Sequence, residues 1–176
     1  MSVSLDDLRA KILEVSDFPE AGLSFQDLSL LLADPDCFRT AVDLLADWAR
    51  PIKPEIVLGA EAGGFVLGGA LAYVLGAGFV AARRANLPAG EAATAVDWET
   101  AGSIDMLEPS SDLIGPGSRV LVHDDLLATG ATAQAKAELV ERLGGVVVGI
   151  AFVVELQLLK GRRRLADRDV HSLIKL

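Results

Sequence analysis

The sequence predicts an α/β fold with a mainly parallel, twisted sheet that is covered by helices on both faces. Short apolar runs alternate with stretches of helical periodicity along most of the chain, which is typical of β-α-β units. These runs are apolar at nearly every position, as in strands that are buried on both sides. The chain has 176 residues, of which 51% are hydrophobic. This is enough for one buried core, and no linker marks a second domain.

The first part of the chain contains two predicted helices. Ser4 and Asp7 have the spacing of a capping box and precede apolar residues at helical spacing, which predicts a helix over residues 5–15. After a break, Asp34 and Pro35 have the residue types of an N-cap and a first helical position. The buried stripe of this second helix is expected to contain Phe38, Val42, Leu45 and Ala49.

Residues 62–82 carry no charge and are long enough in principle to span a bilayer. Their six glycines disfavour one continuous helix, and Gly76-Ala77-Gly78 has the composition of a turn. We therefore expect a strand over 55–59, a buried loop, a helix over 65–75 and a strand over 79–82, with no membrane partner.

The second half continues the alternation. Apolar runs predict strands over 119–123, 146–154 and 170–174, and a helix is expected over 132–143. Between Arg84 and about Ile104 no periodicity is visible. A long irregular connection in a compact domain is usually functional, so we expect a mobile lid over about residues 85–103.

Composition and charge exclude several classes of protein. The formal charge is −9 and the mean hydropathy is +0.40, so the chain is not a disordered acidic segment. Nucleic-acid binding is not expected, because the basic clusters that hold a phosphate backbone are scarce. Cys37 is the single cysteine and no metal-ligand spacing is present, which favours a reducing, cytoplasmic location and no protein-bound metal. No signal peptide is expected at the start of the chain.

The strongest local motif covers residues 120–132, where a strand ends in Asp124 and Asp125 and a loop of small residues opens a helix. The backbone N–H groups of such a loop and the helix N-terminus converge on one spot, which suits a phosphate. Thr129 and Thr132 add hydroxyl donors. Two adjacent carboxylates suit sugar hydroxyls or a divalent cation. The motif thus predicts a phosphorylated sugar; alternatively, the acids only cap a loop.

This motif resembles a known signature. Residues 124–130 (DDLLATG) resemble the 5-phosphoribosyl-1-pyrophosphate signature of type I phosphoribosyltransferases, in the form found in adenine phosphoribosyltransferases. Residues 17–28 are similar to the opening segment of that family, and residues 58–65 to its pyrophosphate loop. Further matches follow in the same order, so the resemblance covers about residues 17–174.

The resemblance implies a single domain over residues 1–176 with the type I phosphoribosyltransferase fold, a hood segment over about 1–34 and the flexible lid. It implies transfer of a 5-phosphoribosyl group from phosphoribosyl pyrophosphate to a purine base, adenine first among them. The products are a nucleoside monophosphate and pyrophosphate, Mg²⁺ accompanies the pyrophosphate, and the protein is a homodimer. The implied catalytic residues are Asp124, Asp125 and Glu99. The implied substrate-binding residues are Ala128, Thr129, Gly130, Ala131 and Thr132 for the 5-phosphate, Ala62, Gly63, Gly64, Arg83 and Arg84 around the pyrophosphate and lid, and Phe25, Gln26 and Leu126 near the base.

Several positions depart from the family pattern. Gly63 stands in place of an Arg in the pyrophosphate loop, and Gln26 in place of an Arg in the opening segment. Residues 100–103 replace the acidic and aromatic lid residues, and Ala131 replaces a loop glycine. The ribose-phosphate half is kept. These changes leave two alternatives: a divergent relative with another acceptor or hydrolytic chemistry, or a non-catalytic phosphoribosyl-ligand-binding protein.

Three further segments carry basic or titratable residues. His123 precedes the acid pair and is interpreted as a hydrogen-bonded core residue, with an acid-base role as the alternative. His171 is expected to be structural. Residues 162–164, three arginines after Gly161, are interpreted as a solvated turn rather than a phosphate site.

Overall fold

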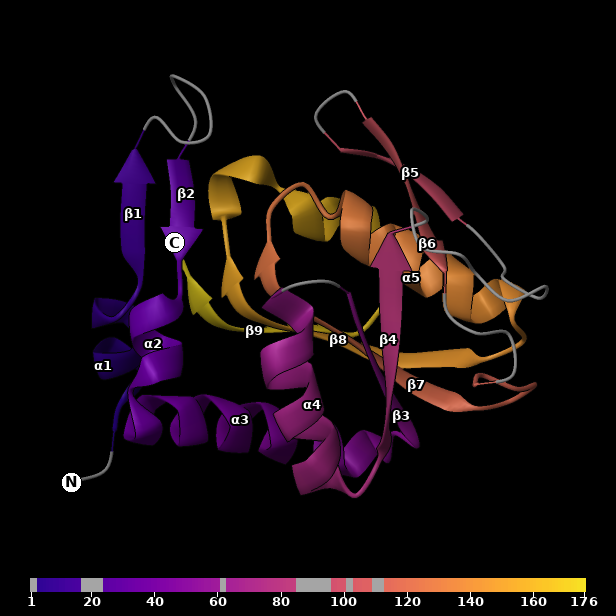
Figure 1. The fold of residues 1–176 in the computed structure, drawn as a ribbon, viewed down its shortest axis with the longest axis horizontal. Helices are drawn as coiled ribbons and strands as arrows, with labels where there is room; N and C mark the ends of the chain where they lie inside the picture. Colours follow the sequence, from indigo (N-terminus) through magenta and orange to yellow (C-terminus); the bar gives the residue numbers. More distant parts are fainter. Residues whose placement is uncertain (1–2, 17–23, 61–62, 85–95, 101–102, 109–112) are drawn as a thin grey trace.

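The computed structural model describes residues 3–16, 24–60, 63–84, 96–100, 103–108 and 113–176. Five parallel strands form the centre of the sheet: β3 (Ile56–Ala60), β4 (Gly78–Arg84), β7 (Arg119–Leu127), β8 (Val146–Glu155) and β9 (Val170–Lys175). An antiparallel hairpin of β5 (Val96–Thr100) and β6 (Ser103–Glu108) extends it at one edge. The strand order is β5-β6-β4-β3-β7-β8-β9 (Figure 1). The predicted mainly parallel sheet is confirmed.

Helices cover both faces of this sheet (Figure 1). The helices are α1 (Leu5–Ala10), α2 (Ser29–Ala33), α3 (Pro35–Ala49), α4 (Gly63–Leu75) and α5 (Ala131–Arg142). One apolar cluster packs the four helices α1, α2, α3 and α4 against one face of the sheet, and it includes Leu121 of β7. A second cluster packs α5 against the opposite face, and it includes Val122 of β7. Successive residues of a strand point to opposite faces, so β7 contributes to both clusters. Short 3₁₀ turns cover Arg50–Ile52, Gln157–Leu159 and Gly161–Leu165.

The prediction of one helix over residues 5–15 is wrong in its second half. The capping box between Ser4 and Asp7 is present, but α1 ends at Ala10. The next residues form β1 (Leu13–Ser16), which pairs antiparallel with β2 (Ser24–Asp27) in a separate two-stranded sheet (Figure 1). The β2 backbone supplies hydrogen-bond partners that the sequence pattern of residues 13–16 alone does not reveal, and tertiary pairing overrides a weak helical periodicity.

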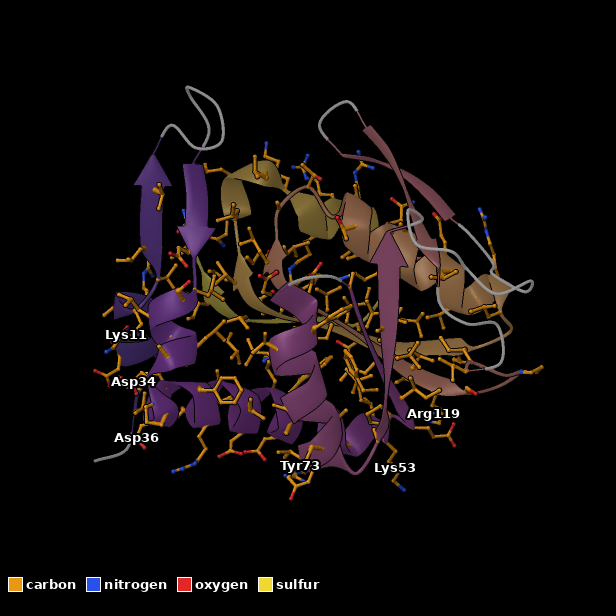
Figure 2. All side chains as sticks on the ribbon, in the orientation of Figure 1. Lys11, Asp34, Asp36, Lys53, Tyr73 and Arg119 are labelled. Carbon is orange, nitrogen blue, oxygen red and sulfur yellow. The ribbon has the colours of Figure 1, made fainter. Side chains whose placement is uncertain are left out.

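The predicted start of α3 is confirmed. Asp34 Oδ1 accepts hydrogen bonds from the backbone N–H groups of Asp36 and Cys37, both at 3.1 Å. Asp34 Oδ2 also pairs with Lys11 Nζ at 3.0 Å, which ties the end of α1 to α3 (Figure 2). The amide of Cys37 and the ammonium of Lys11 together lower the pKa of Asp34 to about 2. Of the expected stripe, Val42, Leu45 and Ala49 are buried and Phe38 is partly buried. Cys37 is buried, as expected.

From Gly63 onward the uncharged segment forms α4, a turn and β4, as predicted from its glycines, although α4 begins two residues before the predicted start at 65. Gly76 has a φ of 67°, a conformation that an L-residue adopts only with strain, and this ends the helix. In the described part of the chain no helix has both the length and the apolar character that crossing a membrane requires.

The lid region is more regular than the sequence pattern indicated. Residues 96–100 pair with 103–108 in the β5–β6 hairpin, and β6 also pairs with the end of β4. The hairpin lies beside α5. Residues 85–95 and 101–102 lie outside the described residues, so the prediction of a mobile lid stays a prediction.

Candidate functional site

The loop that precedes α5 has the geometry of an anion site. Gly130 adopts a φ of 81° and is the N-cap residue, and it has no side chain that could cap the first turn of α5. The N–H groups of this turn therefore remain available to a ligand, at the end of the helix that carries a partial positive charge. Ala131 is the first helical residue, so its Cβ causes no strain at the position where the family has glycine.

Gly161 packs directly against the backbone of this loop. Its role was not predicted from the sequence. A Cβ atom at Gly130 would lie 2.5 Å from the carbonyl oxygen of Gly161. A Cβ atom at Gly161 would overlap the carbonyl oxygen of Ala128 and lie 2.8 Å from the amide nitrogen of Gly130. Two backbones approach each other here as only glycines allow. The glycine before the three arginines was the one available signal.

A hollow of about 50 Å³ lies over the loop. Its lining consists of Leu126, Leu127, Ala128, Thr129, Gly130, Ala131, Thr132, Ala133 and Phe152. All five residues predicted to bind the 5-phosphate, and Leu126, are thus brought together around one space. Because the loop backbone and the helix N-terminus face the same space, its chemistry suits a phosphate group.

The acid pair lies beside this loop, inside β7 rather than after it. β7 continues to Leu127 because β8 offers a pairing partner up to Glu155, and Asp124 is registered opposite Phe152. The predicted strand over 119–123 is therefore four residues too short at its end. Asp124 Oδ1 accepts a hydrogen bond from the amide of Asp125 at 3.2 Å. The two carboxyl groups are consequently held by a rigid strand instead of a loop.

Asp124 forms an ion pair with Lys136, which the sequence interpretation missed. Lys136 Nζ lies 2.6 Å from Asp124 Oδ2, and it donates a hydrogen bond to the carbonyl oxygen of His123 at 3.2 Å. The side chain of Lys136 is fully buried. The signal was present in the sequence, because Lys136 lies three residues after Ala133 and four before Val140, on the buried stripe of α5.

Asp125 faces the first turn of α4. A Cβ atom at Gly63, the first residue of α4, would overlap the Asp125 carboxyl group. A Cβ atom at Gly64 would lie 3.2 Å from Asp124 Oδ1. Burial, and then the negative charge of Asp124, raise the pKa of Asp125 to about 6. Gly63 and Gly64 are thus brought to the acid pair, and their lack of side chains makes room for the two carboxyl groups.

His123 is a core residue, as interpreted. Its ring is fully buried, with Nδ1 3.0 Å from the carbonyl oxygen of Ala151, and Nε2 has no hydrogen-bond partner among the residues that the structure describes. Burial lowers its pKa to about 4, so the ring is neutral near pH 7. The ring contacts the region of Gly68 on α4 instead of the acid pair. His171 stacks on Trp48 with ring centroids 4.9 Å apart, which agrees with a structural role.

The remaining predicted site residues come from other elements. The backbone of Arg83 and Arg84 ends β4, that of Glu99 lies in β5 and that of Phe25 in β2, but their side chains lie outside the described part of the structure, as does the whole of Ala62. Gln26 is buried in β2. The base, pyrophosphate and lid roles therefore stay predictions.

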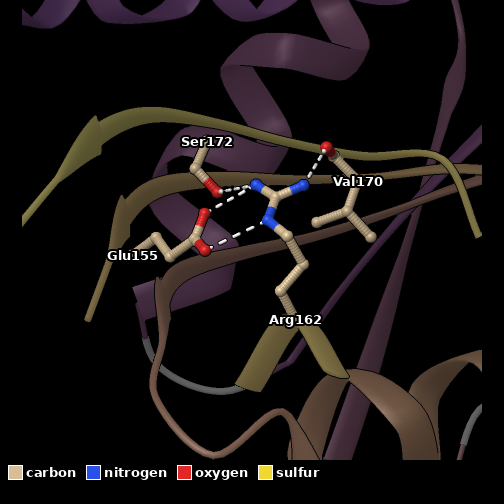
Figure 3. A network of polar contacts seen from close by, with 4 residues as sticks. All are labelled: Glu155, Arg162, Val170 and Ser172. Atoms are coloured by element: carbon tan, nitrogen blue, oxygen red, sulfur yellow. Dashed lines mark hydrogen bonds and ion pairs between the residues drawn. The ribbon is translucent and has the colours of Figure 1, made fainter. Parts of the chain in front are cut away.

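Arg162 is not part of a solvated turn, contrary to the interpretation of residues 162–164. It forms a bidentate pair with Glu155, with Nε–Oε1 at 3.0 Å and Nη2–Oε2 at 2.6 Å, and it donates to the carbonyl oxygen of Val170 and to Ser172 Oγ (Figure 3). The Glu155 side chain is 8% exposed, and its buried charge needs a partner. This network joins the ends of β8 and β9 to the turn that holds Gly161.

No three His, Cys, Asp or Glu side chains gather into a metal-binding group among the residues that the structure describes. Asp124 already has an ammonium partner.

Comparisons with known proteins agree with this geometry. A family model described as phosphoribosyl transferase domain matches residues 32–174. The adenine phosphoribosyltransferase of Solibacter usitatus is 49% identical over 172 residues, which are 97% of this chain and 98% of that protein. The crystal structure of adenine phosphoribosyltransferase from Rhodothermus marinus is 43% identical, covers 98% of both chains and has a TM-score of 0.91.

A second solved structure is the APRTase from Giardia lamblia complexed with 9-deazaadenine. It is 32% identical, covers 99% of this chain and 98% of its own, and has a TM-score of 0.93. Both the family model and these relatives extend over most of the chain, including the acid pair and the loop before α5. The chain therefore belongs to the type I phosphoribosyltransferases, within the group of adenine phosphoribosyltransferases.

Proposed function

We propose that this enzyme transfers the 5-phosphoribosyl group of phosphoribosyl pyrophosphate to adenine, with AMP and pyrophosphate as products. A ring nitrogen of adenine forms the new bond to the anomeric carbon of the ribose. The bond from that carbon to the pyrophosphate oxygen breaks, and the adenine proton leaves to solvent or to a base. The relatives that support this proposal are adenine phosphoribosyltransferases at 42–49% identity.

One observation carries the proposal: a pair of carboxyl groups lies at the carboxyl end of β7, next to the N-terminus of α5, whose N-cap residue Gly130 has no side chain. The helix N-terminus binds a phosphate through backbone N–H groups, and the carboxyl groups accept hydrogen bonds from sugar hydroxyls. Ribose 5-phosphate carries both a phosphate group and ring hydroxyl groups in one small molecule. In this proposal, residues 128–132 hold the 5-phosphate, and Asp124 and Asp125 hold the ribose hydroxyls.

The other roles follow from position in the chain. Residues 62–64 begin α4 next to the acid pair, so we assign them to the pyrophosphate side. Arg83 and Arg84 end β4 and are assigned to the same anion, while Glu99 in β5 is the lid carboxylate near the reacting base. Phe25, Gln26 and Leu126 are assigned to adenine. Most of the rate then comes from positioning and from stabilising the charge that develops on the leaving group.

Mg²⁺ enters this proposal as part of the substrate, bound to the pyrophosphate oxygens. Magnesium prefers octahedral oxygen ligands and is commonly bound through substrate phosphates, with few protein contacts. When bound, it neutralises the leaving pyrophosphate. Binding of the metal mainly by substrate oxygens suits this protein, because Asp124 already forms an ion pair with Lys136.

The test is a transfer assay with the full chain. Protein incubated with adenine, phosphoribosyl pyrophosphate and Mg²⁺ should produce equal amounts of AMP and pyrophosphate, with guanine and hypoxanthine as poorer acceptors. An absence of nucleotide with every purine, from protein that is folded by circular dichroism, would refute the proposal. Production of ribose 5-phosphate without AMP would point to hydrolysis.

The resemblance also implies a homodimer, which we propose for this chain. Tyr73 and Val66 lie seven residues apart in α4, and their exposed fractions are 87% and 51%. The side chain of Tyr73 is labelled in Figure 2. Large apolar side chains exposed on one helix face favour contact with another chain. Sedimentation at micromolar concentration should give a mass of two chains, and a monomer mass would contradict the proposal.

A further inference from the structure

Lys136 is a buried cation that the proposed transfer reaction does not use. It lies in the middle of α5, between Ala133 and Val140 on the face that packs against the sheet. A lysine at such a position loses its hydration, which is unfavourable unless the ammonium finds a charged or polar partner. A small apolar residue would fill the same helix face without this penalty. The lysine therefore requires an explanation other than packing.

Both described partners of Lys136 belong to the acid pair or to the residue before it. Its Nζ atom contacts Asp124 Oδ2 at 2.6 Å and the His123 carbonyl oxygen at 3.2 Å. Asp124 Oδ1 accepts the Asp125 amide at 3.2 Å. Each oxygen of the Asp124 carboxylate thus has a fixed donor, so its plane and rotamer are set. The Asp124 side chain is 15% exposed, so one edge of its carboxyl group remains open to a ligand.

The charge balance of the site depends on the same residue. In the proposed complex, two adjacent carboxyl groups and an anionic substrate lie close together at the carboxyl end of β7. Negative charges that are close together repel each other, which disfavours binding. In the family pattern an arginine occupies position 63, whereas here the Asp125 carboxyl group fills that space. Lys136 lies on the α5 side of the pair, opposite α4. Of the described side chains, it is the cation in contact with these acids.

We infer that Lys136 is a positioning residue for ribose recognition: it holds the Asp124 carboxyl group in one orientation, so that its free edge accepts hydrogen bonds from the ribose hydroxyls. This inference rests on the proposed function for the identity of the sugar, and it adds a residue that acts through Asp124 without touching the substrate. A purely structural lysine would stabilise α5 against the sheet and would not discriminate between sugars.

The test compares ribose 5-phosphate with 2-deoxyribose 5-phosphate, which lacks one hydroxyl group, by titration calorimetry. Wild-type protein should prefer the ribose compound. Lys136→Met keeps the length and removes the charge, and it should reduce that preference at least fivefold while the affinity for the deoxy compound changes less than twofold. The matched control is Arg168→Met, which breaks an ion pair of the same length, 2.6 Å to Glu141 of the same helix, away from the loop. The control should keep the wild-type preference.

Equal losses for both sugar phosphates, or an unchanged preference in Lys136→Met, would overturn the inference. If this variant does not fold, the wild-type protein provides a second measurement. The Nζ resonance of Lys136, observed by NMR with ¹⁵N-labelled lysine, should shift on saturation with ribose 5-phosphate and much less with the deoxy compound. Identical shifts would contradict the inference. Because neither measurement requires turnover, a failed transfer assay would refute the proposed function and leave this test intact.

Discussion

The carboxyl group of Asp125 occupies the space in which a side chain at position 63 would begin. A Cβ atom on Gly63 would overlap this carboxyl group, although the two residues are far apart in the sequence. The contact joins the end of β7 to the first residue of α4. Because position 63 has no side chain, the Asp125 carboxyl group fits against the N-terminus of α4. An arginine at this position, as in the family pattern, would require the carboxyl group to move.

Gly63→Arg should strengthen the binding of pyrophosphate. The Asp125 carboxyl group is the end of a rotatable side chain, so it can turn aside, and the new guanidinium can bind the leaving group in a bidentate manner. We expect the KM for pyrophosphate in the reverse reaction with AMP to fall about tenfold, or roughly 1.4 kcal/mol. Gly69→Arg adds the same charge to α4 where no atom lies within 4 Å, and it should leave this KM unchanged. An equal KM in wild type and Gly63→Arg would contradict the prediction.

Gly130→Ala should destabilise the protein more than Gly117→Ala. Both residues have positive φ, 81° and 80°, so each alanine is strained by roughly 1–2 kcal/mol. Only at Gly130 would the new methyl group meet backbone, the Gly161 oxygen at 2.5 Å, whereas Gly117 has open space. The added overlap should contribute a further 1–3 kcal/mol, roughly, and weaken AMP binding. Urea unfolding of both variants measures the difference, and equal losses would show that the loop can move away from Gly161.

The pKa of Asp125 predicts a pH-dependent stability. Burial and Asp124 raise this pKa to about 6, above the ordinary value of 3.8, so the native state holds a proton that the unfolded state has released. Stability therefore falls as the pH rises from about 4 to about 6, by at most about 3 kcal/mol at 1.36 kcal/mol per pKa unit. The effect is smaller to the extent that water screens the carboxyl group.

Asp125→Asn removes this titration. Its free energy of unfolding should exceed that of the wild type by more at pH 7.5 than at pH 4, as measured by urea denaturation. Other groups, including His123 with its pKa lowered to about 4, cancel in a comparison at one pH. A difference that does not change with pH would show that Asp125 titrates near its ordinary value.

Arg162→Met should destabilise the protein by about 1–3 kcal/mol. It leaves Glu155 buried without its bidentate partner, and part of the usual penalty is relieved because the Arg162 side chain is 39% exposed. The neighbouring Arg163 is exposed, so Arg163→Met should change the free energy of unfolding by less than about 0.5 kcal/mol. Thermal unfolding compares the two. Similar losses in both variants would argue that the positive charge of this turn matters, and the Glu155 pair does not.

Local sequence patterns predicted the five parallel strands of the sheet, the start of α3, and the helices α4 and α5. Apolar runs identify buried strands because both faces of a parallel strand avoid water, and Asp34-Pro35 identifies a helix start because cap chemistry is local. The loop 128–132 was proposed as a phosphate site because small residues before a helix leave its N-terminal N–H groups accessible, and because residues 124–130 resemble a family signature. The alternation of side chains along β7 correctly predicted that His123 points away from Asp124 and into the core, because successive strand residues point to opposite faces.

The contacts around these elements could not be predicted before the fold was known. The pairing of β1 with β2, the ion pair of Lys136 with Asp124, the contact of Asp125 with Gly63 and the packing of Gly161 under Gly130 all join residues that are distant along the chain. Local patterns describe which face of an element is apolar, but they do not describe which atom of another element will lie against it. The acid pair can thus be recognised in the sequence, whereas its ion pair with Lys136 forms only when α5 packs against β7.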